Sequence, residues 1–261
     1  MATTARLVKD SGDTRPPQIS DEEWDIRVQL AAAYRVFDHM GWSLLIFNHI
    51  SMRVPGPDHH FLINPFGLRY DEVCASNLVK IDLTGNKIEE SPWGVNPAGF
   101  VIHSAIHENV PEALCVMHTH TNEGLAIACK KDGLRNTNFY SSMLHDQVAY
   151  HNFEGITERE DEKPRLVASI GSRPIVILRN HGLLTHVRTI PEAFLRMWTI
   201  QAACEAQVLT DGLRGDDIPV SDEASINSTR TAGLFGNDPR GQDVFDAMVR
   251  AIDQKDPSYR N

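Results

Sequence analysis

Apolar residues recur along the chain with two different spacings. Stripes at helical spacing predict helices over residues 21–40, 97–110, 121–131, 190–210 and 240–254. Short apolar runs predict strands over residues 42–53, 61–64, 78–83, 115–120, 148–150, 175–178 and 183–187. Several neighbouring strands are joined by short turns, so the pattern predicts an α/β fold in which helices cover a mixed or antiparallel sheet.

The first helix start and the polar ends of the chain define the predicted domain. Ser20 and Glu23 have the spacing of a capping box, which predicts a helix from residue 21. Residues 1–20 are polar and are expected to be a disordered lead-in. Residues 21–212 are expected to fold as one domain, and residues 213–261 to form a polar linker followed by a C-terminal helix.

The predicted strand at residues 115–120 ends in two histidines. Side chains two apart on a strand share a face, so His118 and His120 are expected about 7 Å apart along the strand. A second apolar strand runs into a glycine turn at His181, which is the best candidate for a third ligand. Three imidazoles so placed could hold one divalent ion at about 2.0–2.1 Å. The alternative is that these histidines are partly buried and bonded to backbone carbonyls.

Two further groups of residues could contribute to a site. His103 and His107 are four apart on the predicted helix and could chelate a metal. The simpler interpretation is that one of them packs or forms hydrogen bonds while the other faces solvent. Residues 133–164 are expected to be mostly irregular and are rich in titratable groups, including Tyr140 and His145. This stretch could line a site or form a surface loop.

Composition and charge limit which kinds of partner and which cellular compartment fit the protein. The 261 residues carry a formal net charge of −10, which argues against nucleic acid or an anionic membrane as the main partner. No apolar run reaches the roughly 20 residues that cross a bilayer, and the N-terminus lacks the apolar core of a secretory signal. The 4 cysteines form no CxxC pair and fit a reducing compartment. A cytoplasmic protein that acts on a small molecule is therefore expected.

Four stretches together resemble the class II aldolase/adducin family, and the similarity spans roughly residues 22–210. They are Asn48-His49-Ile50-Ser51-Met52-Arg53, Asn64-Pro65-Phe66-Gly67, His118-Thr119-His120 and Arg179-Asn180-His181-Gly182-Leu183-Leu184. The resemblance implies a three-layer α/β/α fold around a mostly antiparallel sheet, assembled as a homotetramer with sites near subunit interfaces. It also implies that His118, His120 and His181 bind Zn²⁺ or another divalent ion, such as Mn²⁺, Co²⁺ or Fe²⁺.

The sequence departs from the sugar-phosphate aldolases of this family at several positions. Gly99 stands where those enzymes carry a catalytic acid one helical turn before a histidine. Pro97 and Ala98 replace two serines that help to hold the phosphate, His49 replaces an asparagine, and Phe66-Gly67 replaces a Thr-Gly pair. The substrate-binding positions implied by the resemblance are Asn48, Phe66, Gly67, Pro97, Ala98 and Gly99. A phosphorylated sugar is therefore not the expected substrate.

The residues and the resemblance together predict a metal-dependent lyase. An ion held by three histidines with an open position is a Lewis acid, which could stabilise the enolate formed when a C–C bond of a small hydroxy or keto compound breaks. Retro-aldol cleavage needs a base and an acid, whereas decarboxylation needs only the acid, and the candidate residues are His49, Tyr140 and His145. The alternatives are a non-catalytic adducin-like assembly module and an Fe(II)-dependent oxidative decarboxylase.

Overall fold

The computed structural model describes residues 15–156, 159–234 and 240–261. Its seven strands form one sheet in the order β3-β2-β1-β4-β7-β6-β5. The strands are β1 (His49–Arg53), β2 (Phe61–Ile63), β3 (Val79–Ile81), β4 (Cys115–Thr119), β5 (Val148–His151), β6 (Ile175–Leu178) and β7 (Gly182–Val187). All neighbours are antiparallel except β5 and β6, which are parallel, so the predicted mostly antiparallel sheet is confirmed.

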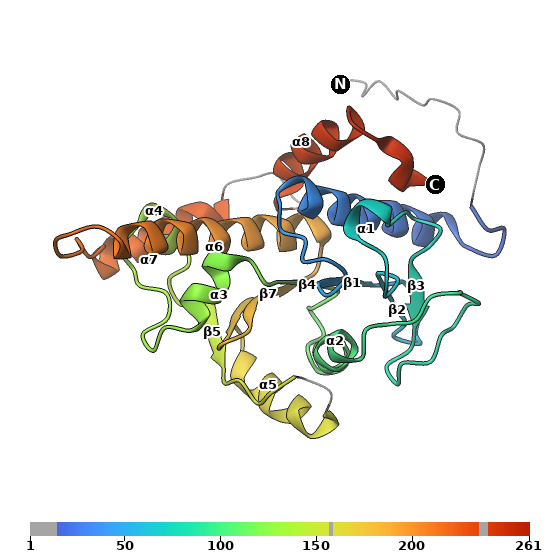
Figure 1. Ribbon diagram of the computed structural model, residues 1–261, viewed down its shortest axis with the longest axis horizontal. Helices are drawn as coiled ribbons and strands as arrows, with labels where there is room; N and C mark the ends of the chain where they lie inside the picture. The colour runs from blue at the N-terminus through green and yellow to red at the C-terminus, as the bar shows by residue number, and fades with distance from the viewer. Residues whose placement is uncertain (1–14, 157–158, 235–239) are drawn as a thin grey trace.

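Helices cover both faces of the sheet. They are α1 (Asp21–His39), α2 (Pro97–Asn109), α3 (Asn122–Ala128), α4 (Phe139–Ser142), α5 (Lys163–Ile170), α6 (Ile190–Asp211), α7 (Asp222–Leu234) and α8 (Gln242–Asp253). Figure 1 shows α1, α6 and α8 on one side of the sheet and α2 and α5 on the other. This arrangement confirms the predicted three-layer α/β/α fold.

Side-chain caps begin the two longest helices, and the cap at Ser20 is the predicted one. The Oγ atom of Ser20 accepts a hydrogen bond from the N–H of Glu23 at 3.2 Å, and Oγ1 of Thr189 accepts one from the N–H of Glu192 at 3.3 Å. Each cap satisfies one of the N–H groups that a helix leaves unpaired in its first turn.

Side-chain alternation along β4 divides the core between the two helical layers. Cys115 and Met117 belong to the apolar cluster that includes α1 and α6, whereas Val116 belongs to the cluster that includes α2 and α5. Because side chains two apart share a face, His118 and His120 continue the row of Val116. The end of β4 therefore directs both histidines to the α2 side of the sheet.

Three local features differ from the sequence-based expectations. Residues 42–48 form a loop rather than the start of a strand, and Leu45 within it is exposed with a φ of 50°. Helix α5 was not predicted, and α7 occupies the stretch predicted to be a polar linker. Since α5 buries only Leu166 and Ile170 and most described side chains of α7 are exposed, neither helix has a strong apolar stripe.

The C-terminal helix packs on the domain. Phe245 and Ile252 of α8 are buried in the same cluster as Phe194 of α6, and the rings of Phe194 and Phe245 have centroids 5.8 Å apart. The predicted helix at residues 240–254 is thus confirmed. The expected disordered lead-in covered residues 1–20. Residues 1–14 lie outside the described residues, so for them it stays a prediction, whereas residues 15–20 are described and include the buried Ile19. No helix in the described part of the chain combines the length and apolar character of a membrane span.

Candidate metal centre

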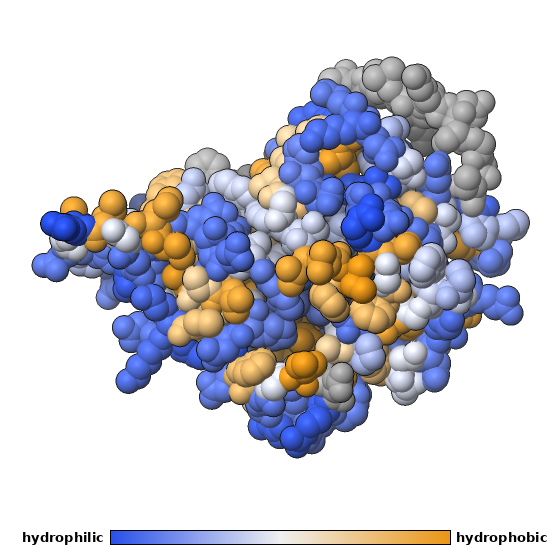
Figure 2. Space-filling view, viewed as in Figure 1, coloured by the Kyte–Doolittle hydropathy of each residue, from blue (hydrophilic) through white to orange (hydrophobic). Residues whose placement is uncertain are grey.

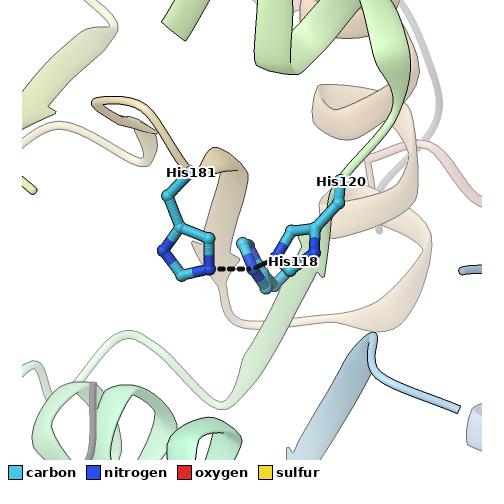
Figure 3. Close-up of side chains that lie close together, drawn as sticks. All are labelled: His118, His120 and His181. Atoms are coloured by element: carbon cyan, nitrogen blue, oxygen red, sulfur yellow. Dashed lines mark hydrogen bonds between the residues drawn. The ribbon is translucent and has the colours of Figure 1, made fainter. Parts of the chain in front are cut away.

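Three histidine side chains, here called the histidine trio, meet at the end of β4. The Nε2 atom of His118 lies 2.6 Å from Nε2 of His120 and 3.2 Å from Nε2 of His181. Figure 3 shows the rings pointing toward one another from β4 and from the turn before β7. Each ring offers a ligand atom, and these atoms all lie within 4.8 Å of one another. The structure therefore brings together the three predicted ligands from two distant parts of the chain.

The backbone around His181 explains how the third ring reaches β4. Asn180 has a φ of 57°, a left-handed conformation that asparagine tolerates better than most residues. Gly182 then approaches β4 so closely that a Cβ atom on it would lie 2.2 Å from the carbonyl oxygen of Thr119. Because only glycine fits this approach, the turn can place His181 directly beside the end of the strand.

One hydrogen bond determines which nitrogen of His118 is free. Its Nδ1 atom lies 2.8 Å from the carbonyl oxygen of Leu183, which can only accept, so Nδ1 donates its hydrogen. The neutral ring therefore has its lone pair on Nε2, the atom that faces His120 and His181. Burial holds the pKa of His118 well below its usual value and lowers the pKa of His181 to about 4. Hydrogen bonding to backbone carbonyls was the alternative interpretation of these histidines. Within the described residues it accounts for Nδ1 of His118 but for no other ring nitrogen of the trio.

The three nitrogen atoms fit a divalent ion. Nitrogen atoms about 2.0–2.1 Å from a tetrahedral zinc ion are roughly 3.3 Å apart, close to the 3.2 Å between His118 and His181. The ring of His120 is closer to His118, but it follows the last residue of β4 and is only partly buried, so it has room to adjust. Three neutral imidazoles leave one tetrahedral position open for a substrate oxygen.

His49 lies between the histidine trio and the start of α2. Its ring centroid is 5.0 Å from that of His118, its antiparallel partner on β4. A Cβ atom on Gly99 would lie 2.5 Å from Cδ2 of His49, closer than real side-chain contacts allow. The His49 ring therefore fills the space in which a side chain at position 99 would begin. The glycine at position 99 thus leaves room for the imidazole of His49.

A row of buried hydrogen bonds leads away from His49. Nδ1 of His49 is 2.8 Å from Nε2 of His103, and Nδ1 of His103 is 2.5 Å from Oγ of Ser51. The same Oγ is 2.7 Å from Nε2 of His107, whose Nδ1 is 2.9 Å from the carbonyl oxygen of Ala113. We call His49, His103, Ser51 and His107 the buried histidine row. His103 and His107 are both fully buried, so the expectation that one faces solvent is wrong, and both bond to Ser51 rather than presenting a chelate on the helix surface.

Acidification should destabilise the fold because His107 is buried as a neutral ring. Burial lowers its pKa to about 3, against about 6.5 in the unfolded chain. The unfolded state therefore binds more protons between these values, and stability falls as the pH drops from about 6.5 toward 3. At pH 5 this difference in proton binding at His107 lowers the free energy of unfolding by about 2 kcal/mol. Denaturant unfolding at pH 7 and pH 5, with a chelator present, measures the difference.

Two histidine variants separate this effect from general acid sensitivity. His107→Gln should reduce the stability difference between pH 7 and pH 5 by about 2 kcal/mol. His59→Gln, which replaces an exposed histidine, should leave that difference unchanged. A His107→Gln protein with the wild-type pH dependence would contradict the neutral, buried state of the ring.

The other two candidate catalytic residues lie away from the histidine trio within the chain. Tyr140 of α4 packs edge-on against Trp198 of α6, with ring centroids 5.5 Å apart. His145 lines a separate hollow with Arg135 and Arg173. The structure does not bring either side chain to the three ligands, and their roles in proton transfer stay predictions.

The predicted substrate-binding loops are held mainly by backbone contacts. Asn48 is buried, and its Nδ2 donates to the carbonyl oxygen of Trp42 at 2.8 Å, while its Oδ1 has no hydrogen-bond partner among the described residues. Phe66 donates its N–H to the carbonyl oxygen of Gly94 at 2.9 Å, and Gly67 is exposed. Binding roles for Asn48, Phe66 and Gly67 stay predictions.

A small hollow beside the histidine trio contains a carboxylate that the sequence did not single out. Its lining includes Ile102, His151, Phe153, Glu162, Arg179 and His181. The ring of Phe153 is 6.3 Å from that of His181, and Nε2 of His151 is 3.2 Å from Oε1 of Glu162. Glu162 comes just before α5, and no sequence spacing links it to the ligands, so only the fold places it there.

Comparisons with known proteins agree with this geometry. The family model described as Class II Aldolase and Adducin N-terminal domain matches residues 28–208. Mouse alpha-adducin is 39% identical over 242 residues, which cover 87% of this chain and 33% of that protein. The crystal structure of an aldolase II superfamily protein from Pseudomonas syringae has a TM-score of 0.89 and 39% identity, covering 94% of this chain and 98% of that one.

A second solved structure has an assigned activity in its name. The L-fuculose 1-phosphate aldolase from Glaciozyma antarctica has a TM-score of 0.82 and 27% identity, and the match covers 95% of this chain and 98% of that chain. Similarity in sequence and in fold thus extends along most of the chain. The chain therefore belongs to the class II aldolase/adducin family, whose enzymes are generally lyases that depend on a divalent metal.

Proposed function

We propose that the protein is a metal-dependent lyase that cleaves a C–C bond of a small, non-phosphorylated hydroxy or keto compound, by retro-aldol cleavage or decarboxylation. The observation that carries the proposal is the convergence of three Nε2 atoms, with His118 held in the tautomer that can ligate through Nε2. A divalent ion bound there would act as a Lewis acid toward a substrate oxygen. Zn²⁺ is the expected ion, and Mn²⁺, Co²⁺ and Fe²⁺ are the other candidates.

The start of α2 supports a substrate without a phosphate group. Helix N-termini bind phosphates through free N–H groups, but Pro97 at the start of α2 has none. The N–H of Ala98 already donates to Oδ1 of Asn96 at 3.2 Å. Pro97, Ala98 and Gly99 also offer no side-chain hydroxyl. A phosphate would therefore find few partners at this helix end.

The outer surface supports an assembly of several copies. Figure 2 shows apolar surface at the projecting end formed by α6 and α7, where Leu209, Leu213 and Ile218 are 72%, 72% and 85% exposed. Exposed apolar patches commonly mark protein interfaces. We expect a cytoplasmic homotetramer, and the particle mass from light scattering tests the assembly.

Two other functions fit parts of the observations. The 39% identity to mouse alpha-adducin favours a non-catalytic assembly module, but a scaffold has no need for three imidazoles whose free nitrogens converge. An Fe(II)-dependent oxidative decarboxylase would use the same three ligands, since imidazole also suits iron. Oxygen uptake by an iron-loaded sample distinguishes this chemistry from that of a lyase.

A substrate panel tests the proposal. Samples loaded with each ion would be assayed against 2-keto acids, 2-hydroxy acids and unphosphorylated hydroxyketones, with a sugar phosphate as the comparison. We expect pyruvate, aldehyde or CO₂ to be released from at least one unphosphorylated compound, in a reaction that stops on chelation and resumes when the ion returns. If no loaded sample turns over any compound, the lyase is rejected in favour of the assembly module.

A further inference from the structure

The hydrogen bonds of the buried histidine row have only one consistent direction. The carbonyl oxygen of Ala113 can only accept, so Nδ1 of His107 donates to it. Burial lowers the pKa of His107 to about 3 and that of His103 well below its usual value, so each neutral ring carries one hydrogen. Nε2 of His107 therefore has a lone pair, and the hydroxyl of Ser51 donates to it.

The same reasoning continues to His49. Because Ser51 has donated its only hydroxyl hydrogen, its oxygen accepts from Nδ1 of His103. Nε2 of His103 is then the nitrogen without a hydrogen, and it accepts from Nδ1 of His49. Nε2 of His49 is left with a lone pair, and it has no hydrogen-bond partner among the described residues. The tautomer of His49, that is, which of its ring nitrogens carries the hydrogen, is thus set by the carbonyl group of Ala113 at the far end of the row.

The ring that carries this nitrogen lies beside the histidine trio, with its centroid 5.0 Å from that of His118. Nε2 of His49 is 2.9 Å from the position that a Cβ atom on Gly99 would occupy, and the His49 ring is tilted by 30° against the ring of His118. Within the described residues, His49 does not join the group of mutually close ligand atoms, so it lies next to the metal ligands rather than among them. His49 is only 3% exposed. A lone pair on a nitrogen with so little access to water needs a donor, and a hydroxyl group of a bound ligand is one that can supply it.

We propose that the buried histidine row fixes His49 in its Nδ1–H tautomer so that Nε2 accepts a hydrogen bond from a hydroxyl group of the substrate. The inference rests on the proposed function, because it places the substrate at the histidine trio. His49 is then a residue that contacts the substrate, while His103, Ser51 and His107 are positioning residues that act through it. A hydroxy compound satisfies the lone pair, whereas an analogue without the hydroxyl leaves it unpaired.

The tautomer of His49 can be measured without any assay of activity. Solid-state NMR of protein labelled with ¹⁵N in its histidines distinguishes protonated ring nitrogens from bare ones. The His49→Gln variant identifies the signals that belong to His49. We expect a protonated Nδ1 and a bare Nε2 in the wild-type protein. A protonated Nε2 on His49 would overturn the proposal.

Removal of the Ser51 hydroxyl tests the role of the row in activity. In Ser51→Ala, His103 loses the acceptor for its Nδ1 hydrogen, so we expect a mixture of tautomers at His49. The value of kcat/KM for the best hydroxy substrate should fall at least about 10-fold, and so should its preference over the analogue without the hydroxyl. The metal content per chain should stay at the wild-type level, and Ser51→Thr, which keeps the hydroxyl, should recover activity.

Ser104→Ala is the matched control. It also removes a buried serine hydroxyl, but one that lies on α2 and outside the buried histidine row. Ser104 donates to the carbonyl oxygen of Val101 and takes no part in the row. This variant should keep both the tautomer of His49 and the activity. Wild-type kcat/KM in Ser51→Ala would overturn the proposal. Failure of the proposed function gives a different result. In that case the wild-type protein turns over no compound, while the NMR spectrum still shows which nitrogen of His49 carries the hydrogen.

Discussion

Replacing His181 with alanine should lower turnover by more than about 100-fold. Loss of a residue that merely supports a metal ligand typically costs about 10–100-fold, and loss of the ligand itself should cost more. We choose His181 for replacement because it lies on a turn and is partly exposed, so its loss should disturb the fold less than loss of His118, which is fully buried on β4. Steady-state turnover at saturating metal, together with competitive zinc titration, measures both the rate and the affinity.

His186→Gln provides the control for removal of a nearby histidine. His186 lies on β7 and its Nε2 is 2.9 Å from the carbonyl oxygen of Arg173, to which a glutamine side chain can also donate. This variant should retain wild-type zinc affinity and turnover. Wild-type turnover in His181→Ala would show that the reaction does not depend on the histidine trio.

Gly99→Ala should destabilise the protein by about 1–3 kcal/mol and lower turnover at least about 10-fold, although alanine favours a helix more than glycine does. The added methyl group would meet the His49 ring, which is buried and bonded to His103. In a His49→Ala background the same change should be neutral or stabilising by up to about 1 kcal/mol. Denaturant unfolding of the four proteins of this cycle gives the coupling energy.

Gly233→Ala controls for the intrinsic effect of the substitution. Gly233 lies in α7, and a Cβ atom on it would meet nothing within 4 Å. Alanine there should stabilise the protein by about 0.5–1 kcal/mol. If Gly99→Ala destabilises the protein equally with and without the imidazole of His49, the two residues do not compete for the same space.

The sheet could be predicted largely because its central strands are continuously buried. Every residue of β6 and of β7 is buried, so each gives a short apolar run bounded by turn residues. The parallel pairing of β5 with β6 could not be predicted in the same way. It depends on the connection through α5, whose apolar face is small. Helix α7 was not predicted because its stability depends on its contacts with other elements of the fold, including α4, and not on an apolar stripe of its own.

The convergence of the three candidate metal ligands was predictable because strand spacing and a glycine turn place them, whereas the rest of the candidate site depends on tertiary contacts. His118 and His120 share a face by local geometry alone. The role of Ser51 and the conflict between Gly99 and His49 arise only when β1 pairs with β4 and α2 packs across them. No pattern along the chain contains that information.

Elemental analysis of the wild-type protein, stripped with a chelator, reloaded with Zn²⁺ and passed through gel filtration, tests the account most directly. Three converging imidazoles predict about one tightly held ion per chain. A protein that retains no zinc, and likewise none of manganese, cobalt or iron, would contradict the metal centre and with it the proposed chemistry.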